Sequence, residues 1–479
     1  MSSSTVKNLT FEMRPPPPKA HLHKTLPDSA FPKGFLLSGT HVGIKKSKSA
    51  EDLGLILTTS PAERTSAAAV FTQNSFAAAP VRVSANVLAA RSGRGVRGVV
   101  VNSGCANAVT GQKGEEDAWA MVRAAGEVGN AAVASTTSSS PAGDNDEANM
   151  LVMSTGVIGV RLPIDKILSG IQALPSSLGS SPAHWDSVAR AFLTTDTFPK
   201  LRARTFAVTH ADGTQREYRL AGMSKGAGMI HPRMGASVPT ATGLHATLLS
   251  AIMTDVHVAP KALQSALNYA CARSFNAISV DGDMSTNDTV VVLASGAADA
   301  LEIDEKDNES FIQFRDALTD VAKELAQLVV RDGEGATKFV TVTVKGTKTY
   351  DDAHTIASRI STSALVKTAL YGEDANWGRI LASLGSLQEL SAPIDPSRVS
   401  VSFIPAQQQN GTAPSDSPKP LLLLHNGEPQ PLDEAHASSL LSQTDIEILL
   451  DIGLGEESAQ YWTCDFSYEY VRINGDYRS

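Results

Sequence analysis

Hydrophobic residues recur along this chain with two different periods, which mark where strands and helices are expected. Short runs rich in β-branched and apolar residues, bounded by turn residues, predict strands at AAAVFTQNSF, APVRVSANVL and RGVVVNSG. Apolar positions at helical spacing predict long amphipathic helices at PKALQSALNYACARSFNAI and ESFIQFRDALTDVAKELAQLVVRDGEG. Parallel and antiparallel signals are mixed and no internal repeat is apparent, so the pattern predicts a fold of the α/β or α+β class.

The pattern changes near residues 350–358, where we predict a domain boundary. Two helices, SALVKTALYG and WGRILASLGSL, follow this point, and then come strands and a polar loop at 405–420. The sequence therefore predicts a smaller C-terminal α/β domain over residues 356–479.

The beginning of the chain differs from the rest in composition. The first 24 residues are rich in serine, carry four basic residues against the single acid Glu12, and include four consecutive prolines. They lack the apolar core of a secretory signal. Residues 1–30 are therefore predicted to be a targeting segment or a disordered tail, and composition favours neither over the other.

Composition and charge argue against several classes of function. The net charge of the 479 residues is −9 at pH 7, whereas nucleic-acid binding needs clustered Lys and Arg. No apolar run approaches the roughly 18 residues of a membrane helix. The three cysteines, Cys105, Cys271 and Cys464, lack metal-like spacing and are predicted to be reduced core residues. We expect no nucleic acid, membrane, metal or bound cofactor.

Three Gly-punctuated turns carry candidate binding groups. MSTGVIG places Thr155 and Gly156 after an apolar strand, where adjacent N–H and hydroxyl groups suit a developing oxyanion. Lys225 lies beside glycines in MSKGAGMIHP and suits a carboxylate, and Glu334 lies between glycines in RDGEG and suits an amine. A plain strand–turn junction, an exposed lysine and a solvated turn acid are the alternatives.

Two further motifs allow a structural or a functional interpretation. LTTDTFPK (193–200) is either part of a polar site or a helix terminus before Pro199. SVDGDMSTNDTV (279–290) has the oxygen density of a calcium loop without the spacing of an EF-hand, so metal binding is its minor interpretation.

The stretch PTATGLHATLLSAIMTD (239–255) combines many hydroxyls with an apolar run that is expected to be buried. A threonine at a newly formed chain end needs no histidine, because its own α-amine, with a pKa of about 8, acts as the base for its Oγ. The Ala246–Thr247 bond suits such a cleavage, since a small preceding residue lets the hydroxyl reach the carbonyl carbon. Composition alone does not select this bond over those at Thr240 and Thr242.

Eight ordered motifs resemble the bifunctional ornithine acetyltransferase/glutamate N-acetyltransferase family of arginine biosynthesis. They are NSGCANAVTG, MSTGVIG, TTDTFPK, KGAGMIHP with ATLLSAIMTD, VDGDMSTNDT, RDGEGATKF, ANWGRI and INGDYRS. The similarity runs from about residue 35 to the last residue and leaves out the Pro-rich start and the 405–420 loop. It implies the α/β (α+β) sandwich of this family of self-cleaving N-terminal-nucleophile enzymes.

The resemblance also implies a reaction and an assembly. Cleavage at Ala246–Thr247 would separate an α chain (31–246) from a β chain, which would complete the catalytic domain with residues 247–355 and continue into the C-terminal domain. The two chains would stay together, commonly as an α2β2 heterotetramer. Thr247 would take the acetyl group of N2-acetyl-L-ornithine as an ester and pass it to L-glutamate by ping-pong kinetics, with acetyl-CoA as a further donor. Fungal relatives place this reaction in the mitochondrial matrix.

Carried onto this sequence motif by motif, the resemblance gives each site residue a role. Thr155 and Gly156 would stabilise the oxyanion. The substrate contacts would be Thr194, Lys225, Thr247, Glu334, Asn474 and Ser479. A lysine suits the α-carboxylate that acetylornithine and glutamate both present, and a glutamate suits an ammonium, which acetylornithine has on its side chain and glutamate has on its α-carbon. One site would therefore serve the donor and the acceptor in turn.

The sequence departs from the family pattern at two places, and two alternative functions follow from its chemistry. Residues 235–245 (GASVPTATGLH) separate Met234 from Ala246, and we expect an exposed bulge there. An uncleaved, inactive homologue is the alternative. Ser479 stands where threonine is common and keeps the hydroxyl and the carboxylate.

A second alternative function is an N-terminal-threonine amidase or aminopeptidase, which would deliver the acyl group to water.

Overall fold

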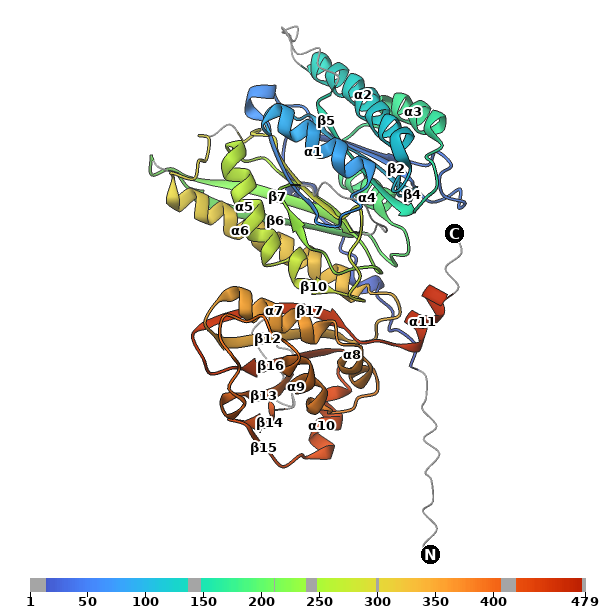
Figure 1. The fold of residues 1–479 in the computed structure, drawn as a ribbon. Helices are drawn as coiled ribbons and strands as arrows, with labels where there is room; N and C mark the ends of the chain where they lie inside the picture. The colour runs from blue at the N-terminus through green and yellow to red at the C-terminus, as the bar shows by residue number, and fades with distance from the viewer. Residues whose placement is uncertain are drawn as a thin grey trace, which may run out of the picture.

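The described chain forms two lobes, one above the other in Figure 1. The computed structural model describes residues 14–136, 148–210, 212–237, 248–298, 301–405 and 419–475. The larger, N-terminal lobe contains two sheets, and the smaller, C-terminal lobe contains a third. None of the helices in these segments combines the length and the apolar composition needed to span a bilayer.

The first sheet has four strands in the order β1-β2-β4-β5. Its strands are β1 (Phe35–Thr40), β2 (Leu53–Thr58), β4 (Gly98–Cys105) and β5 (Met150–Val157). The β4–β5 pair is parallel and buried along most of its length. Such continuous burial is typical of strands covered on both faces, and four helices contact this sheet: α1 (Ala79–Arg91), α2 (Gly111–Thr136), α3 (Ile164–Ala173) and α4 (Pro182–Phe192).

The second sheet has six strands in the order β6-β7-β9-β11-β3-β8. Its strands are β3 (Ser66–Thr72), β6 (Lys200–Thr209), β7 (Gln215–Lys225), β8 (Met234–Gly235), β9 (Leu249–Thr254) and β11 (Thr289–Ala294). Alternate residues face opposite sides of a sheet, and here each side has its own core. Ile252 and Val292 belong to a core with α5 (Pro260–Ala272) and α6 (Asn308–Arg331), whereas Ala251 and Val291 belong to a core with the first sheet.

The third sheet has seven strands in the order β10-β17-β12-β16-β13-β14-β15. Its strands are β10 (Ile278–Ser279), β12 (Phe339–Thr347), β13 (Ser400–Pro405), β14 (Leu421–His425), β15 (Glu428–Pro429), β16 (Asp445–Asp451) and β17 (Glu457–Cys464). The remaining α-helices are α7 (Tyr350–Ser361), α8 (Ala364–Tyr371), α9 (Trp377–Gly385), α10 (Glu434–Leu441) and α11 (Tyr468–Gly475). Short 3-10 turns occur at Ala20–Leu22, Asp28–Ala30, Ala62–Arg64, Leu174–Ser177, Phe275–Ala277 and Pro396–Arg398.

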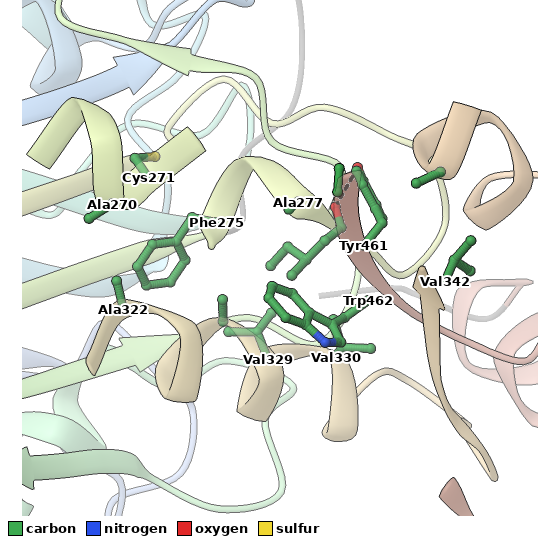
Figure 2. Close-up of a cluster of buried hydrophobic side chains, with 14 of the residues drawn as sticks. Ala270, Cys271, Phe275, Ala277, Ala322, Val329, Val330, Val342, Tyr461 and Trp462 are labelled. Carbon is green, nitrogen blue, oxygen red and sulfur yellow. Dashed lines mark hydrogen bonds between the residues drawn. The ribbon is translucent and has the colours of Figure 1, made fainter. Parts of the chain in front are cut away.

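The two lobes share one hydrophobic core. Phe275, from the N-terminal lobe, lies near Val329 and Val330 of α6 and near Tyr461 and Trp462 of β17 (Figure 2). The Tyr461 hydroxyl donates to the Ile278 carbonyl at 3.0 Å. The short strand β10 also pairs in parallel with β17. Backbone pairing and apolar packing therefore fix the C-terminal lobe against the lobe that precedes it.

The prediction of a strand at APVRVSANVL is wrong, because this segment is helix α1. Val83 and Val87 are both buried at i, i+4 spacing, and the Ser84 hydroxyl donates to the Val152 carbonyl at 2.7 Å. Packing against the two sheets outweighs the strand preference of valine. Pro80 in the first turn was the helix signal in the sequence.

Several other sequence predictions can be compared directly with the structure. The mixed α/β class is confirmed, and all three cysteines are buried and free. The apolar end of the 239–255 stretch forms strand β9. The predicted division at 355/356 falls inside α7, after β12 has joined the third sheet. Residues 1–13, most of the 405–420 loop and residues 238–247 lie outside the described residues.

Candidate active site

Thr155 and Gly156 lie at the end of β5, where β4 and β5 come unusually close. Thr155 is fully buried. Gly156 has φ of 126°, and a Cβ at this position would lie 2.4 Å from the carbonyl carbon of Gly104 on β4. Only glycine fits such a contact and such a backbone. The pairing of β4 and β5 also shifts register at Gly104, which bends the strand ends.

Lys225 reaches Thr155 from the neighbouring sheet. It is the last residue of β7, its side chain is buried, and its ammonium Nζ donates to the Thr155 hydroxyl at 3.3 Å. Burial lowers the pKa of Lys225, and the negative charge of Asp196 opposes this effect. An ammonium has only donors, so the Thr155 oxygen accepts from Lys225 and its own hydrogen remains to be donated elsewhere.

Asp196 connects the threonine-rich loop to the glycine-rich loop. One carboxylate oxygen accepts from the Lys200 ammonium at 2.5 Å and from the Gly226 backbone N–H at 2.7 Å, and the other accepts from the Thr194 N–H at 3.0 Å. Burial by itself raises the pKa of Asp196, but the charges of Lys200 and Lys225 hold that pKa well below its ordinary value. Asp196 is therefore an ionised anchor for Thr194 and for the backbone after Lys225.

Lys200 extends this network to the turn that carries Glu334. Its ammonium also donates to Asp332 at 2.6 Å, and the Lys200 and Asp196 side chains are fully buried. The Thr197 hydroxyl and its backbone N–H both donate to the Asp332 carboxylate. Burial would lower the pKa of Lys200, but the two carboxylates raise it. The cation thus joins two motifs that are far apart in the sequence.

Glu334 lies in the turn between α6 and β12. Its backbone N–H donates to the Ala227 carbonyl at 2.7 Å. Its carboxylate accepts from the Asn474 side-chain amide of α11 at 2.9 Å. The carboxylate also packs against Gly228, where a Cβ would lie 2.3 Å from an oxygen of Glu334. The glycine therefore makes room for the carboxylate beside the loop that follows Lys225.

The structure brings the described site residues into one connected set. Thr155, Gly156, Thr194, Lys225, Glu334 and Asn474 are linked through β5, the loop after β7, Asp196 and α11. Ala246, Thr247 and Ser479 lie outside the described residues. The described chain resumes at Leu248, directly before β9, and Leu249 pairs with Lys225. The described chain therefore resumes next to this set.

Comparison with known proteins assigns the chain to a family. A model of the ArgJ family matches residues 36–479. The chain belongs to the ArgJ family. A protein from Postia placenta is 60% identical over 98% of this chain and 97% of its own length, and one from Laccaria bicolor is 55% identical over 100% of both. Both are named mitochondrial arginine biosynthesis bifunctional protein ArgJ.

One similar solved structure is that of an ornithine acetyltransferase. The ornithine acetyltransferase of Mycobacterium tuberculosis, solved with ornithine, is 34% identical and has a TM-score of 0.34. The match covers 43% of this chain and 95% of that one. The family assignment rests on the family model and on the fungal relatives.

Sequence reasoning missed several groups of this candidate site. Asp196, Lys200 and Asp332 lie within the quoted motifs, but their ion pairs were not predicted, because no spacing in the sequence links Lys200 to Asp332, 132 positions away. Lys45 was also missed. It packs against Gly104, and burial lowers its pKa to about 8, an effect that Asp52 and Asp196 oppose. A lysine in a Gly-Ile-Lys turn gives no signal of its own.

The acidic loop at 279–290 uses its carboxylates to hold neighbouring backbone. Asp281 accepts from the N–H groups of Met229 and Ile230, and Asp288 accepts from Leu248 at 3.0 Å. No group of three or more His, Cys, Asp or Glu side chains suited to a metal occurs in the described segments. The loop therefore positions the start of β9 and the Gly-rich loop.

Asp288 predicts a specific dependence of stability on pH. Burial raises the pKa of Asp288 to about 7, although bonds from Leu248 and Ser285 oppose the shift. Between about pH 4 and 7 the folded chain thus holds a proton that the unfolded chain releases, so the free energy of unfolding falls as pH rises. Asp288→Asn removes this proton uptake. Between pH 5 and 7.5 the free energy of unfolding of the variant should therefore vary less with pH than that of the parent. The two slopes should differ by up to about 1.4 kcal/mol per pH unit.

Urea denaturation at several pH values tests this prediction. The matched control is Asp283→Asn, which changes an exposed acid of the same loop and should keep the pH dependence of the parent. If the free energy of unfolding of Asp288→Asn fell with pH as steeply as that of the parent, the Asp288 carboxyl would be ionised throughout this range.

Proposed function

We propose that this ArgJ-family chain transfers the acetyl group of N2-acetyl-L-ornithine to L-glutamate through an acetyl ester on Thr247. The chain is an acetyltransferase of arginine biosynthesis, and it is mitochondrial like its fungal relatives. The observation that carries the proposed mechanism is the single set of contacts that joins Thr155, Lys225, Glu334 and Asn474 beside the start of β9.

The first chemical step in this proposal is self-cleavage. The Thr247 Oγ attacks the Ala246 carbonyl carbon, the peptide C–N bond breaks, and an ester forms between the two residues. Water then hydrolyses the ester and leaves a carboxylate on Ala246 and an α-amine on Thr247. That amine is the base for the hydroxyl beside it.

The acetyl transfer then uses the groups around Lys225. The Thr247 Oγ attacks the acetyl carbonyl of acetylornithine, and the Thr155 hydroxyl, with its oxygen held by Lys225, donates to the oxyanion together with the Gly156 N–H. Ornithine leaves with the proton that the Thr247 amine had taken. The amine of glutamate attacks the ester, and Thr247 regains its proton as N-acetylglutamate leaves.

Substrate recognition in the proposal follows from charge. Lys225 is a buried cation for the α-carboxylate. Glu334 is an anion, held by Asn474, for an ammonium, which is on the side chain of acetylornithine and on the α-carbon of glutamate. Thr194 and Ser479 complete the set of substrate contacts, and acetyl-CoA is a second acetyl donor.

We also propose that the α and β chains stay associated, as an α2β2 heterotetramer. The substrates are small molecules.

Ornithine release measured with and without glutamate tests the transfer. With acetylornithine alone, the purified protein should release about one ornithine per site, because the acetyl ester then waits for an acceptor. Adding glutamate should start continuous release and form N-acetylglutamate in equal amount. Continuous release without glutamate would identify an amidase or aminopeptidase that passes the acyl group to water.

A further inference from the structure

The beginning of the described chain lies against the elements that hold Glu334. Residues 14–22, here called the N-terminal strap, precede the segment matched by the family model, which starts at residue 36. Lys19 of the strap donates from its ammonium to the Gly333 carbonyl at 3.1 Å. Gly333 is the residue directly before Glu334. The strap therefore touches the backbone of the turn that presents the candidate substrate carboxylate.

The strap is also fixed at its two ends. Arg14 forms an ion pair with Glu373, and its backbone N–H donates to the Tyr371 hydroxyl at 3.2 Å. At the other end, the Leu22 carbonyl accepts from the Arg202 guanidinium at 2.9 Å. These anchors lie in different lobes, since Arg202 belongs to β6 and Tyr371 to α8.

The anchor at Tyr371 leads back to the same carboxylate. The Tyr371 ring meets the Tyr468 ring edge-on, with centroids 5.9 Å apart. Tyr468 is the first residue of α11, the helix whose Asn474 donates to Glu334. The strap thus contacts the turn that carries Glu334 directly through Lys19, and it is linked to α11 indirectly, through Tyr371 of α8.

Individual hydrogen bonds and an ion pair hold the strap. A cavity of about 320 Å³ lies between it and the third sheet, and its lining includes Pro17, Pro18, Lys19, Arg331 and Thr337. Lys19 itself is half-buried and lies near the negative charge of Asp332. Lys19 lines this cavity, so we expect removal of its ammonium to take this donor away from the Gly333 carbonyl.

We infer that the N-terminal strap is part of the substrate site and that Lys19 is a positioning residue, which holds the Gly333 carbonyl so that Glu334 faces the substrate ammonium. This inference rests on the proposed role of Glu334. The inference also limits where a mitochondrial presequence can be removed, because the cut must leave Arg14 and Lys19 on the mature chain.

Steady-state kinetics of Lys19→Met, made in the full chain, test the inference. The variant keeps most of the unbranched side chain and loses the donor. KM for acetylornithine and for glutamate should therefore rise about tenfold while kcat stays within about twofold, as expected for lost ground-state binding. Lys19→Arg keeps a donor and should restore KM to within about threefold of the parent. The control Lys24→Met, at an exposed lysine two residues beyond the strap, should match the parent.

A double variant separates positioning from general stability. Glu334→Gln should raise KM by itself, and adding Lys19→Met should raise it little further, because both changes act on the same contact. Parent-like KM values in Lys19→Met, with a functional parent and a defective Glu334→Gln, overturn the inference and leave the proposed function intact. A parent that transfers no acetyl group overturns the proposed function. Mature mitochondrial protein that begins after Lys19 and keeps the parent KM also overturns the inference.

Discussion

Thr247→Ala should leave the polypeptide uncut and should abolish acetyl exchange. The variant lacks the hydroxyl that attacks the Ala246 carbonyl and the hydroxyl that carries the acetyl group, so both reactions fail together. Loss of a covalent nucleophile lowers turnover by about 10³-fold or more. A denaturing gel reports cleavage, and N-acetylglutamate formation from acetylornithine and glutamate reports exchange.

Matched threonine variants give this prediction its control. Thr240→Ala and Thr242→Ala change hydroxyls in the same stretch, PTATGLHATLL, and should be cut and active like the parent. Thr247→Ser keeps a hydroxyl and an α-amine and should retain part of both reactions. Normal processing of Thr247→Ala together with failure of Thr242→Ala would move the nucleophile to residue 242.

Lys200→Met should destabilise the protein and disrupt the site at the same time. The Lys200 ammonium is buried between Asp196 and Asp332, and methionine leaves these two carboxylates without their cation. Removing one partner from a buried ion network costs about 3–5 kcal/mol in the free energy of unfolding. Acetyl exchange should fall as well, because Asp196 anchors Thr194 and the backbone N–H of Gly226.

The free energy of unfolding from urea denaturation measures this effect, and a second substitution assigns its cause. Adding Asp332→Asn to Lys200→Met removes one uncompensated charge and should recover part of the lost stability. Lys261→Met changes an exposed lysine at the start of α5 and should stay within about 0.5 kcal/mol of the parent. A Lys200→Met variant as stable as the parent would show that the network contributes nothing to folding.

Hydrophobic periodicity predicted most of the elements because burial in this fold follows the period of each element. In α6, buried Phe314, Leu318, Val321 and Leu325 recur at i, i+3 and i, i+4. In β11, continuous burial comes from cores on both faces of the sheet. The pattern failed at α1, where alternating valines in a short run have strand character and only the packing between two sheets selects the helix.

The candidate site could be predicted from the sequence only as separate motifs. Thr155, Lys225 and Glu334 each stand next to a glycine in the sequence, which is a local signal. Their supports are not local. The bond from Asn474 to Glu334 spans 140 positions, and the bond from Lys19 to Gly333 spans 314. Such contacts form only because the fold places α11 and the strap next to the turn after α6. No local pattern in the sequence predicts that placement.

The intact mass of freshly purified, active protein tests the central claim most directly. Self-cleavage predicts two polypeptides, one ending at Ala246 and one beginning with Thr247, with masses that add up to the precursor plus one water. Active protein that consists of a single uncut polypeptide would contradict the proposed N-terminal threonine and the mechanism built on it.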